Sequence, residues 1–448
     1  MVIYMNDEYL LTTPMAKQLY TEVARDLPLI DYHNHLTVKD LTDDRVFQDI
    51  AELWVISDPY KHRAMRICGV DETLITGDAD HKAKFRAWCE TYPKLMGTPL
   101  YDWSRMELQE VFGISTEING ENADQIWDEA NALLKTPKFS AHGLFNHFHV
   151  EYAAPCASLT DDFSGFSCVE GLAPSLRGDD LLVPTVELIQ KLEKKSGIAV
   201  NNLDSFRQAI SSCLDQIAAV NCRFADHALD NGFTYVPDDD GFEQRLMKVL
   251  NSETLTDHDR TALTSDMLRL LGEEYAKRRF VLQLHIGAQR FTSSTLRRIA
   301  GPAGGFAGIG NSVDVVSLVN LLDDLEKGPH GLPRTILFTL NPADNALFAT
   351  LSGSFRGVTQ GPAWWWCDHL QGMRDMLETF TTHSVLSTFV GMTTDSRSLL
   401  SLLRHDYFRR MFCGWAGEKA ERGELPNCFE KLAELVTAVC YGNAKKLI

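Results

Sequence analysis

The sequence predicts an α/β fold, and within that class a (β/α)8 TIM barrel with helical insertions. Short apolar runs suited to buried parallel strands alternate along the chain with segments of helical periodicity. Repeated strand-then-helix order is typical of a parallel α/β fold. The 448 residues, 44% hydrophobic and 23% charged, allow one large core, and barrels that carry insertions reach this length as a single domain.

Six apolar runs are predicted to be strands, and a polar or glycine-containing loop and then a helical pattern follow most of them. They cover residues 27–31, 150–154, 280–285, 335–340, 363–366 and 387–392. Two long stretches, about 80–140 and 203–278, have helical periodicity without a strand signal and are predicted to be helical insertions. Because no repeat, low-complexity tract or linker divides the chain, residues 1–448 are expected to form one barrel domain.

Charge and cysteine content limit the partners and the compartment. A net charge of −18 argues against nucleic acid or an anionic membrane surface as a partner, because both attract basic faces. The 10 cysteines include no C-x-x-C pair, which suits a reducing cytoplasm. The N-terminus lacks the pattern of a secretory signal, and no apolar run approaches the roughly 18 residues of a membrane helix. A cytoplasmic protein is expected.

The first candidate site is L-I-D-Y-H-N-H-L, residues 29–36, where an apolar run ends in two histidines. Residues two apart on a strand point to the same face, so His33 and His35 can both reach one divalent metal. The C-terminal ends of barrel strands host the active site. The alternative is a pair of histidines exposed in a loop. A second pair, His147 and His149, precedes a strand and is expected to be structural.

The second candidate site is F-V-G-M-T-T-D-S-R-S, residues 389–398, where an apolar run enters a polar turn. Asp395 can complete a two-histidine, one-carboxylate ligand set. The alternative is that Asp395 and Ser396 cap the following helix. Arg397 can hold a carboxylate through two parallel hydrogen bonds, or it can be a solvated surface residue.

Eight segments, in this order, support a family resemblance. They are D-Y-H-N-H-L (31–36), D-P-Y-K-H-R-A-M-R (58–66), T-P-L-Y-D-W (98–103), Q-L-H-I-G-A-Q-R (283–290), L-N-P-A-D-N (340–345), A-W-W-W-C-D (363–368), G-M-T-T-D-S-R-S (391–398) and R-H-D-Y-F-R-R (404–410). On these segments the chain resembles the uronate isomerase family, which includes glucuronate isomerase and is a branch of the amidohydrolase superfamily. The last two motifs are the most specific, whereas H-x-H is shared by the whole superfamily.

The resemblance implies a metal centre and a reaction. His33, His35 and Asp395 would be the ligands of a divalent metal, with zinc the expected ion. The implied reaction interconverts D-glucuronate with D-fructuronate, and D-galacturonate with D-tagaturonate, by proton transfer between C1 and C2 through an enediol. Such a reaction needs a base, an acid and stabilisation of oxyanion charge. Asp395 would serve as ligand and as base.

The resemblance also implies which residues meet the hexuronate substrate. Tyr60 would contact the sugar and assist proton transfer, Arg177 and Arg397 would bind substrate oxygens, and His285 would line the pocket. Each has a plainer alternative, such as helix-start packing for Tyr60 and a satisfied core position for His285. Relatives of this kind make a homo-oligomer the expected assembly.

Three alternatives stay open at this point. The first is an isomerase for a different sugar acid, since the chain departs from the family pattern at His62 and in G-F-A-G-I-G-N (305–311). The second is a metal-dependent hydrolase on the same barrel, because fold alone does not decide the reaction. The third is a barrel that binds metal without catalysis.

Overall fold

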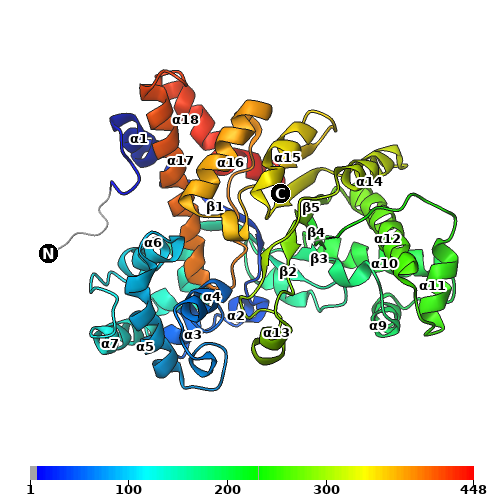
Figure 1. Cartoon of the computed structure of the whole chain (residues 1–448), viewed down its shortest axis with the longest axis horizontal. Coiled ribbons are helices and arrows are strands. Elements are labelled where there is room, and N and C mark those ends of the chain that lie inside the picture. Colours follow the sequence, from blue (N-terminus) through cyan, green and yellow to red (C-terminus); the bar gives the residue numbers. More distant parts are fainter. Residues whose placement is uncertain (1–7, 231) are drawn as a thin grey trace.

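A seven-stranded, all-parallel sheet forms the centre of the computed structural model, which describes residues 8–230 and 232–448 (Figure 1). The sheet is curled and its strand order is β1-β2-β3-β4-β5-β8-β9. The strands are β1 (Leu29–Asn34), β2 (Val150–Ala157), β3 (Ser175–Arg177), β4 (Phe224–Leu229), β5 (Val281–Ile286), β8 (Thr335–Thr339) and β9 (Val358–Gln360). A separate antiparallel pair joins β6 (Ala288–Gln289) to β7 (Gly308–Ile309). The predicted α/β class is confirmed.

The strands are buried on both faces, as the apolar runs predict. Every residue of β1, β5 and β8 is buried. Side chains from several strands form an apolar cluster of their own, in which the rings of Tyr32 and Phe224 stack at 5.7 Å. Burial on both faces is typical of a parallel sheet covered by helices. The sheet is therefore a rigid base for side chains at its strand ends.

Helices surround the sheet (Figure 1). They are α1 (Pro14–Leu19), α2 (Val38–Thr42), α3 (Ile50–Trp54), α4 (Pro59–Ile67), α5 (His81–Thr91), α6 (Pro99–Met106), α7 (Ala123–Leu134), α8 (Ala141–His147), α9 (Val186–Ser196), α10 (Leu203–Ala219), α11 (Phe242–Leu250), α12 (Asp257–Arg278), α13 (Ser294–Ala300), α14 (Val315–Lys327), α15 (Asn345–Leu351), α16 (Leu370–His383), α17 (Arg404–Glu421), α18 (Phe429–Thr437) and α19 (Asn443–Lys445). Within the described residues, no helix combines the length and apolarity needed to cross a membrane. The predicted absence of a signal segment concerns in part residues 1–7, which lie outside the described residues.

Two of the six predicted strands are wrong. The runs 363–366 and 387–392 contain 3-10 turns at Trp365–Cys367 and Leu386–Thr388. The backbone of Trp365 is left-handed, with φ 52°, which an extended strand does not allow. The chain after the second run still lies beside β1, because His35 N donates to Ser396 O at 2.8 Å. Ala363, Trp364 and residues 389–392 are buried, whereas Ser387 and Thr388 are exposed, so the pattern indicated burial for part of each run but not regular strand pairing.

The predicted helical insertion at 203–278 is also wrong in part. Strand β4 lies inside it, after α10 and before α11 and α12. Its sequence F-A-D-H-A-L buries Asp226 and His227, and these two polar residues interrupt the apolar run that marks a strand. The short strands β3 and β9 were missed too, because three residues each are too few for a periodic signal. The stretch 80–140 is mainly helical and contains α5, α6 and α7.

Candidate active site

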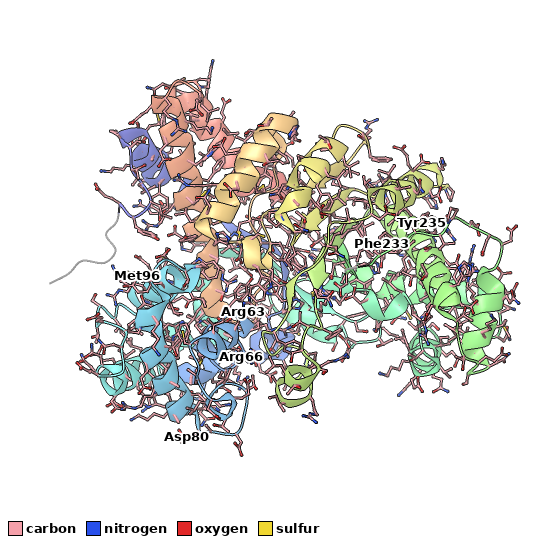
Figure 2. The ribbon with its side chains drawn as sticks, viewed as in Figure 1. Arg63, Arg66, Asp80, Met96, Phe233 and Tyr235 are labelled. Carbon is pink, nitrogen blue, oxygen red and sulfur yellow. The ribbon has the colours of Figure 1, made fainter. Side chains whose placement is uncertain are left out.

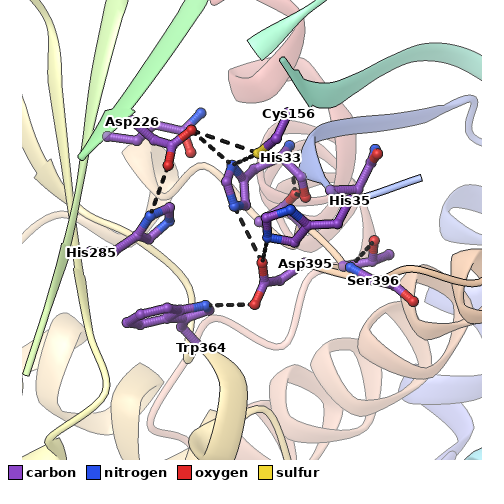
Figure 3. A network of polar contacts seen from close by, with 12 residues as sticks. His33, His35, Cys156, Asp226, His285, Trp364, Asp395 and Ser396 are labelled. Atoms are coloured by element: carbon purple, nitrogen blue, oxygen red, sulfur yellow. Dashed lines mark hydrogen bonds and ion pairs between the residues drawn. The ribbon is translucent and has the colours of Figure 1, made fainter. Parts of the chain in front are cut away.

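His33, His35 and Asp395 converge at the C-terminal end of β1 (Figure 3). His33 Nε2 lies 3.2 Å from Asp395 Oδ1, and His35 Nε2 lies 3.1 Å from the same oxygen. The His33 side chain is buried, whereas His35 and Asp395 are 22% and 15% exposed. The structure thus brings Asp395 into contact with two histidines that lie about 360 positions earlier in the sequence.

These donors fit a divalent metal. His33 Nε2 is buried and faces Asp395 Oδ1 at 3.2 Å, so an imidazole nitrogen and a carboxylate oxygen that can share one cation lie together in the interior. His33 also belongs to two groups of donor atoms within 4.8 Å of one another, one with His35 and Cys156 and one with Asp226 and His285. Imidazole nitrogens with a carboxylate are a common ligand set for first-row divalent ions.

Charges at this site stabilise each other. Burial alone would raise the pKa of Asp395, yet its hydrogen bonds to His33 and His35 hold that pKa well below its usual value. Burial alone would lower the pKa of His33, but nearby Cys156, Asp226 and Asp395 raise it well above its usual value. Asp395 is therefore a carboxylate throughout the neutral pH range.

Asp226, on β4, forms a second, fully buried anionic centre beside the first (Figure 3). Arg177 NH1 donates to its Oδ2 at 2.7 Å, and His285 Nδ1 lies 3.6 Å from the same oxygen. Its Oδ1 lies 3.8 Å from His33 Nδ1. Asp226 therefore links Arg177 and His285 to a candidate metal ligand. Arg177 also pairs with Asp179 at 2.7 Å.

His285 and Trp364 form one wall of the site. The His285 ring stacks on Trp364 with centroids 4.7 Å apart and lies 4.5 Å from the His33 ring. Burial, with the neighbouring His33, lowers the pKa of His285 to about 4, so this ring is neutral at pH 7. Trp364 Nε1 donates to Asp395 Oδ2 at 2.9 Å. The indole thus orients the oxygen of Asp395 that lies away from the imidazoles.

Arg397 lies at the edge of a cavity that also reaches His35. The cavity has a volume of about 220 Å³, and Thr37, Arg45 and Ser398 also line it. Arg397 itself is exposed. A guanidinium at this edge can meet a carboxylate that enters from solvent, as the sequence predicts. Its role in binding stays a prediction.

Tyr60 lies in the first turn of α4, where Asp58 caps the helix by accepting from Tyr60 N at 2.9 Å. The Tyr60 hydroxyl donates to Asp368 Oδ2 at 3.0 Å, and the Arg404 guanidinium carbon lies 4.5 Å above the ring. Arg404 NH1 is also 3.6 Å from Asp368 Oδ2. Tyr60 is thus part of a buried trio with Asp368 and Arg404, and its catalytic role stays a prediction.

Asp368→Asn is expected to change the pH dependence of stability. Burial, with repulsion from Asp395, raises the pKa of Asp368 from 3.8 to about 7, although Arg404 opposes this. The folded protein therefore binds a proton that the unfolded chain releases, and the associated stability, full below pH 3.8, is lost as the pH rises through about 7. Asparagine does not titrate, so the variant should gain roughly 2–3 kcal/mol relative to the natural protein between pH 5 and pH 8.

Urea unfolding of both proteins at pH 5 and pH 8 measures this difference directly. A difference between the two proteins that is independent of pH would show that Asp368 is already ionised at pH 5.

Helix α4 carries two arginines, Arg63 and Arg66, which Figure 2 labels. Arg66 pairs with Glu72 through bonds of 2.9 and 2.8 Å. Arg63 donates to Ala307 O at 3.2 Å and lies 4.8 Å over the Trp366 ring. Both side chains have partners within the protein, as expected for structural residues.

Three acidic residues near the site were not predicted as site residues. Asp31 and Asp368 lie inside the motifs D-Y-H-N-H-L and A-W-W-W-C-D, so those motifs already contained them. Asp226 lies in none of the eight motifs, and only recognition of β4 as a strand could have indicated it. An acidic residue inside a buried strand by itself indicates a charged partner or a functional role, because an unpaired buried charge is costly.

A curled parallel sheet with two histidines and one carboxylate at a strand end is the arrangement expected of a metal-binding α/β enzyme. The family model described as glucuronate isomerase matches residues 1–448. The chain belongs to the glucuronate isomerase family.

Individual relatives agree with this family. A uronate isomerase of Salmonella paratyphi B is 38% identical over 466 residues, which cover 100% of this chain and 99% of the relative. The crystal structure of a uronate isomerase from Thermotoga maritima has a TM-score of 0.93 and 29% identity, with 100% of both chains covered. A glucuronate isomerase structure from Caulobacter crescentus, 22% identical over 99% of this chain and 96% of that one, has a TM-score of 0.91 and supports the fold. The predicted family is confirmed, which favours isomerisation over hydrolysis.

Proposed function

We propose that this chain interconverts D-glucuronate with D-fructuronate, and D-galacturonate with D-tagaturonate. The observation that carries the proposal is the convergence of His33, His35 and Asp395 beside the cavity that Arg397 lines, in a chain of this family. The reaction moves one proton between C1 and C2 and another between their oxygens, through an enediol.

The two imidazoles and Asp395 would hold one divalent ion, and zinc is the ion proposed. Nitrogen and carboxylate donors in a set of three suit a catalytic zinc site, which keeps a position open for substrate. When bound, the ion would polarise a sugar oxygen and stabilise the negative charge that develops there.

Arg397 and Arg177 would bind the substrate carboxylate and neighbouring oxygens. A protein with a net charge of −18 repels an anion at long range, so nearby guanidinium groups must offset that repulsion. Arg397 lines the cavity, and Arg177 is connected to His33 through Asp226. His285, neutral at pH 7, would form the wall of the same pocket.

Asp395 and Tyr60 would move the protons. Asp395 Oδ1 faces the imidazoles, while Oδ2 accepts from Trp364, so the carboxylate is held in one orientation and can accept a proton from the substrate carbon. Tyr60, with Asp368 as its hydrogen-bond acceptor, would exchange a proton with a sugar oxygen. A neighbouring cation lowers the basicity of Asp395, so proton transfer to Asp395 is the step most worth testing.

The proposal also covers closure of the barrel, the cellular location and the oligomeric assembly of the enzyme. The segment that carries Asp395 would close the curled sheet into a (β/α)8 barrel, because Asp395 N donates to His33 O at 3.1 Å beside β1. A cytoplasmic location suits ten cysteines that are all free. A homo-oligomer is proposed from membership of this family. Size-exclusion chromatography with light scattering tests the assembly.

Incubation of the purified protein and Zn²⁺ with glucuronate or galacturonate tests the proposed reaction. Ketose formation is expected from both uronates. Glucose and galactose are the controls, because they lack the carboxylate that the arginines would bind, and they should react far more slowly. Absence of ketose from both uronates would contradict the proposal, and conversion of another sugar acid alone would redirect it to that substrate.

A further inference from the structure

A fully buried carboxylate, Asp31, lies on β1 just before the histidine pair. Thr394 donates to it twice, from N to Oδ1 and from Oγ1 to Oδ2, both at 2.7 Å. Thr393 Oγ1 lies 2.9 Å from Oδ1, Asn34 Nδ2 donates to Oδ2 at 2.9 Å, and His405 Nε2 lies 3.2 Å from Oδ1. Both oxygens are thus engaged within the protein, so Asp31 is suited to hold structure and not to bind substrate.

Its two threonine partners connect the segments that carry the candidate metal ligands. Thr393 Oγ1 accepts from His33 N at 2.9 Å and donates to His33 O at 2.7 Å. Thr394 precedes Asp395, whose N donates to the same carbonyl at 3.1 Å. Every one of these contacts joins residues about 360 positions apart in the sequence.

The backbone of Asp395 is strained. Its φ is 50°, in the left-handed region that non-glycine residues rarely adopt. Such a conformation persists only where surrounding contacts determine it, and strained residues of this kind cluster at functional sites. The two hydrogen bonds from Thr394 to Asp31, and the hydrogen bonds of Thr393 Oγ1 with the His33 backbone, are the contacts immediately before the strained residue.

We infer that Asp31 is a positioning residue for the metal centre: it holds the turn of Thr393 and Thr394 against β1 and so places the Asp395 carboxylate between His33 and His35. This inference rests on the proposed metal centre. A merely structural anchor would affect stability alone, whereas a positioning residue sets metal affinity and ligand geometry. Partners behind the ligands of a metal site typically contribute about 10–100-fold in affinity.

Asp31→Asn tests the inference. The amide has the size of the carboxylate but turns a donor toward Thr394 or Asn34, which are themselves donors. Transfer of Zn²⁺ from the loaded protein to a chromophoric chelator gives the affinity, and the visible spectrum of the Co²⁺-loaded protein reports the ligand geometry. The Kd for Zn²⁺ should rise about 10–100-fold, and the Co²⁺ spectrum should change.

Asp266→Asn is the matched control. Asp266 is equally buried and accepts charged hydrogen bonds from Arg245 at 2.8 Å and Arg269 at 2.5 Å, on helices apart from the metal centre. This variant should lose stability without changing the Kd for Zn²⁺ or the Co²⁺ spectrum.

Thr394→Val gives a second, milder test that does not depend on how well the Asp31 variant folds. Valine has the shape of threonine and removes one hydrogen bond to Asp31, so a rise in Kd of about fivefold is expected. If the natural protein takes up neither Zn²⁺ nor Co²⁺, the proposed metal centre itself fails. If it binds both, and the folded Asp31 and Thr394 variants bind equally tightly with the same spectrum, the inference about Asp31 is overturned and the proposed function stands.

Discussion

Removal of the metal with a chelator is expected to lower kcat for glucuronate at least about tenfold, and Zn²⁺ should restore it. The reason is geometric: His33 and His35 both direct Nε2 at one oxygen of Asp395, so the site is organised for a cation between them. Without the ion, these donors can only pair with each other. The developing charge on the sugar oxygen then loses its main stabilisation.

Metal analysis, activity and thermal unfolding should be measured on the same samples. Zn²⁺ at 100 times its Kd should stabilise the folded protein by about 2.7 kcal/mol and raise Tm. Mg²⁺ is a useful comparison, because it prefers oxygen ligands and should restore less activity. Full activity in protein shown to contain no metal would contradict the proposed role of the ion.

The fold could be predicted where a strand carries a run of apolar residues, and not where adjacent polar residues interrupt that run. The runs near β1, β2, β5 and β8 were recognisable because each contains consecutive apolar residues, and all residues of β1, β5 and β8 and five of the eight residues of β2 are buried. Strand β4 was not recognised, because the adjacent buried polar residues Asp226 and His227 break its apolar pattern, and of these two Asp226 contacts the site. At functional residues the local sequence pattern does not always match the local structure, so sequence-based prediction is expected to fail there.

The candidate site, too, could be predicted only in part from the sequence. The proximity of His33, His35 and Asp395 could be predicted because motifs carry them and strand periodicity places the histidines on one face, whereas the role of Arg397 stays a prediction. Their supporting contacts join distant parts of the chain, as in the bond from Tyr60 to Asp368 across 308 positions. No local pattern encodes such a pair, so these contacts required the three-dimensional structure.

Asp395→Asn is expected to reduce kcat about 10²–10⁴-fold when Zn²⁺ is saturating, which is the usual contribution of a general base. Asparagine keeps the size of the side chain and an oxygen that can accept from Trp364, while it loses the charge and the ability to take a proton. The low pKa of Asp395 means that the natural protein offers a carboxylate at every pH used in the assay. Its loss should therefore appear in kcat without shifting a pH optimum.

Metal content decides what such a loss means, because Asp395 is proposed as both ligand and base. A variant that retains one Zn²⁺ per chain but loses turnover would separate the base from the ligand, whereas one that loses both would identify Asp395 mainly as a ligand. Asp266→Asn, a buried carboxylate apart from the site, controls for the general effect of removing an acid. Near-normal kcat with metal bound would assign the proton transfer to another group, and Tyr60, whose hydroxyl is held by Asp368, would be the next residue to replace.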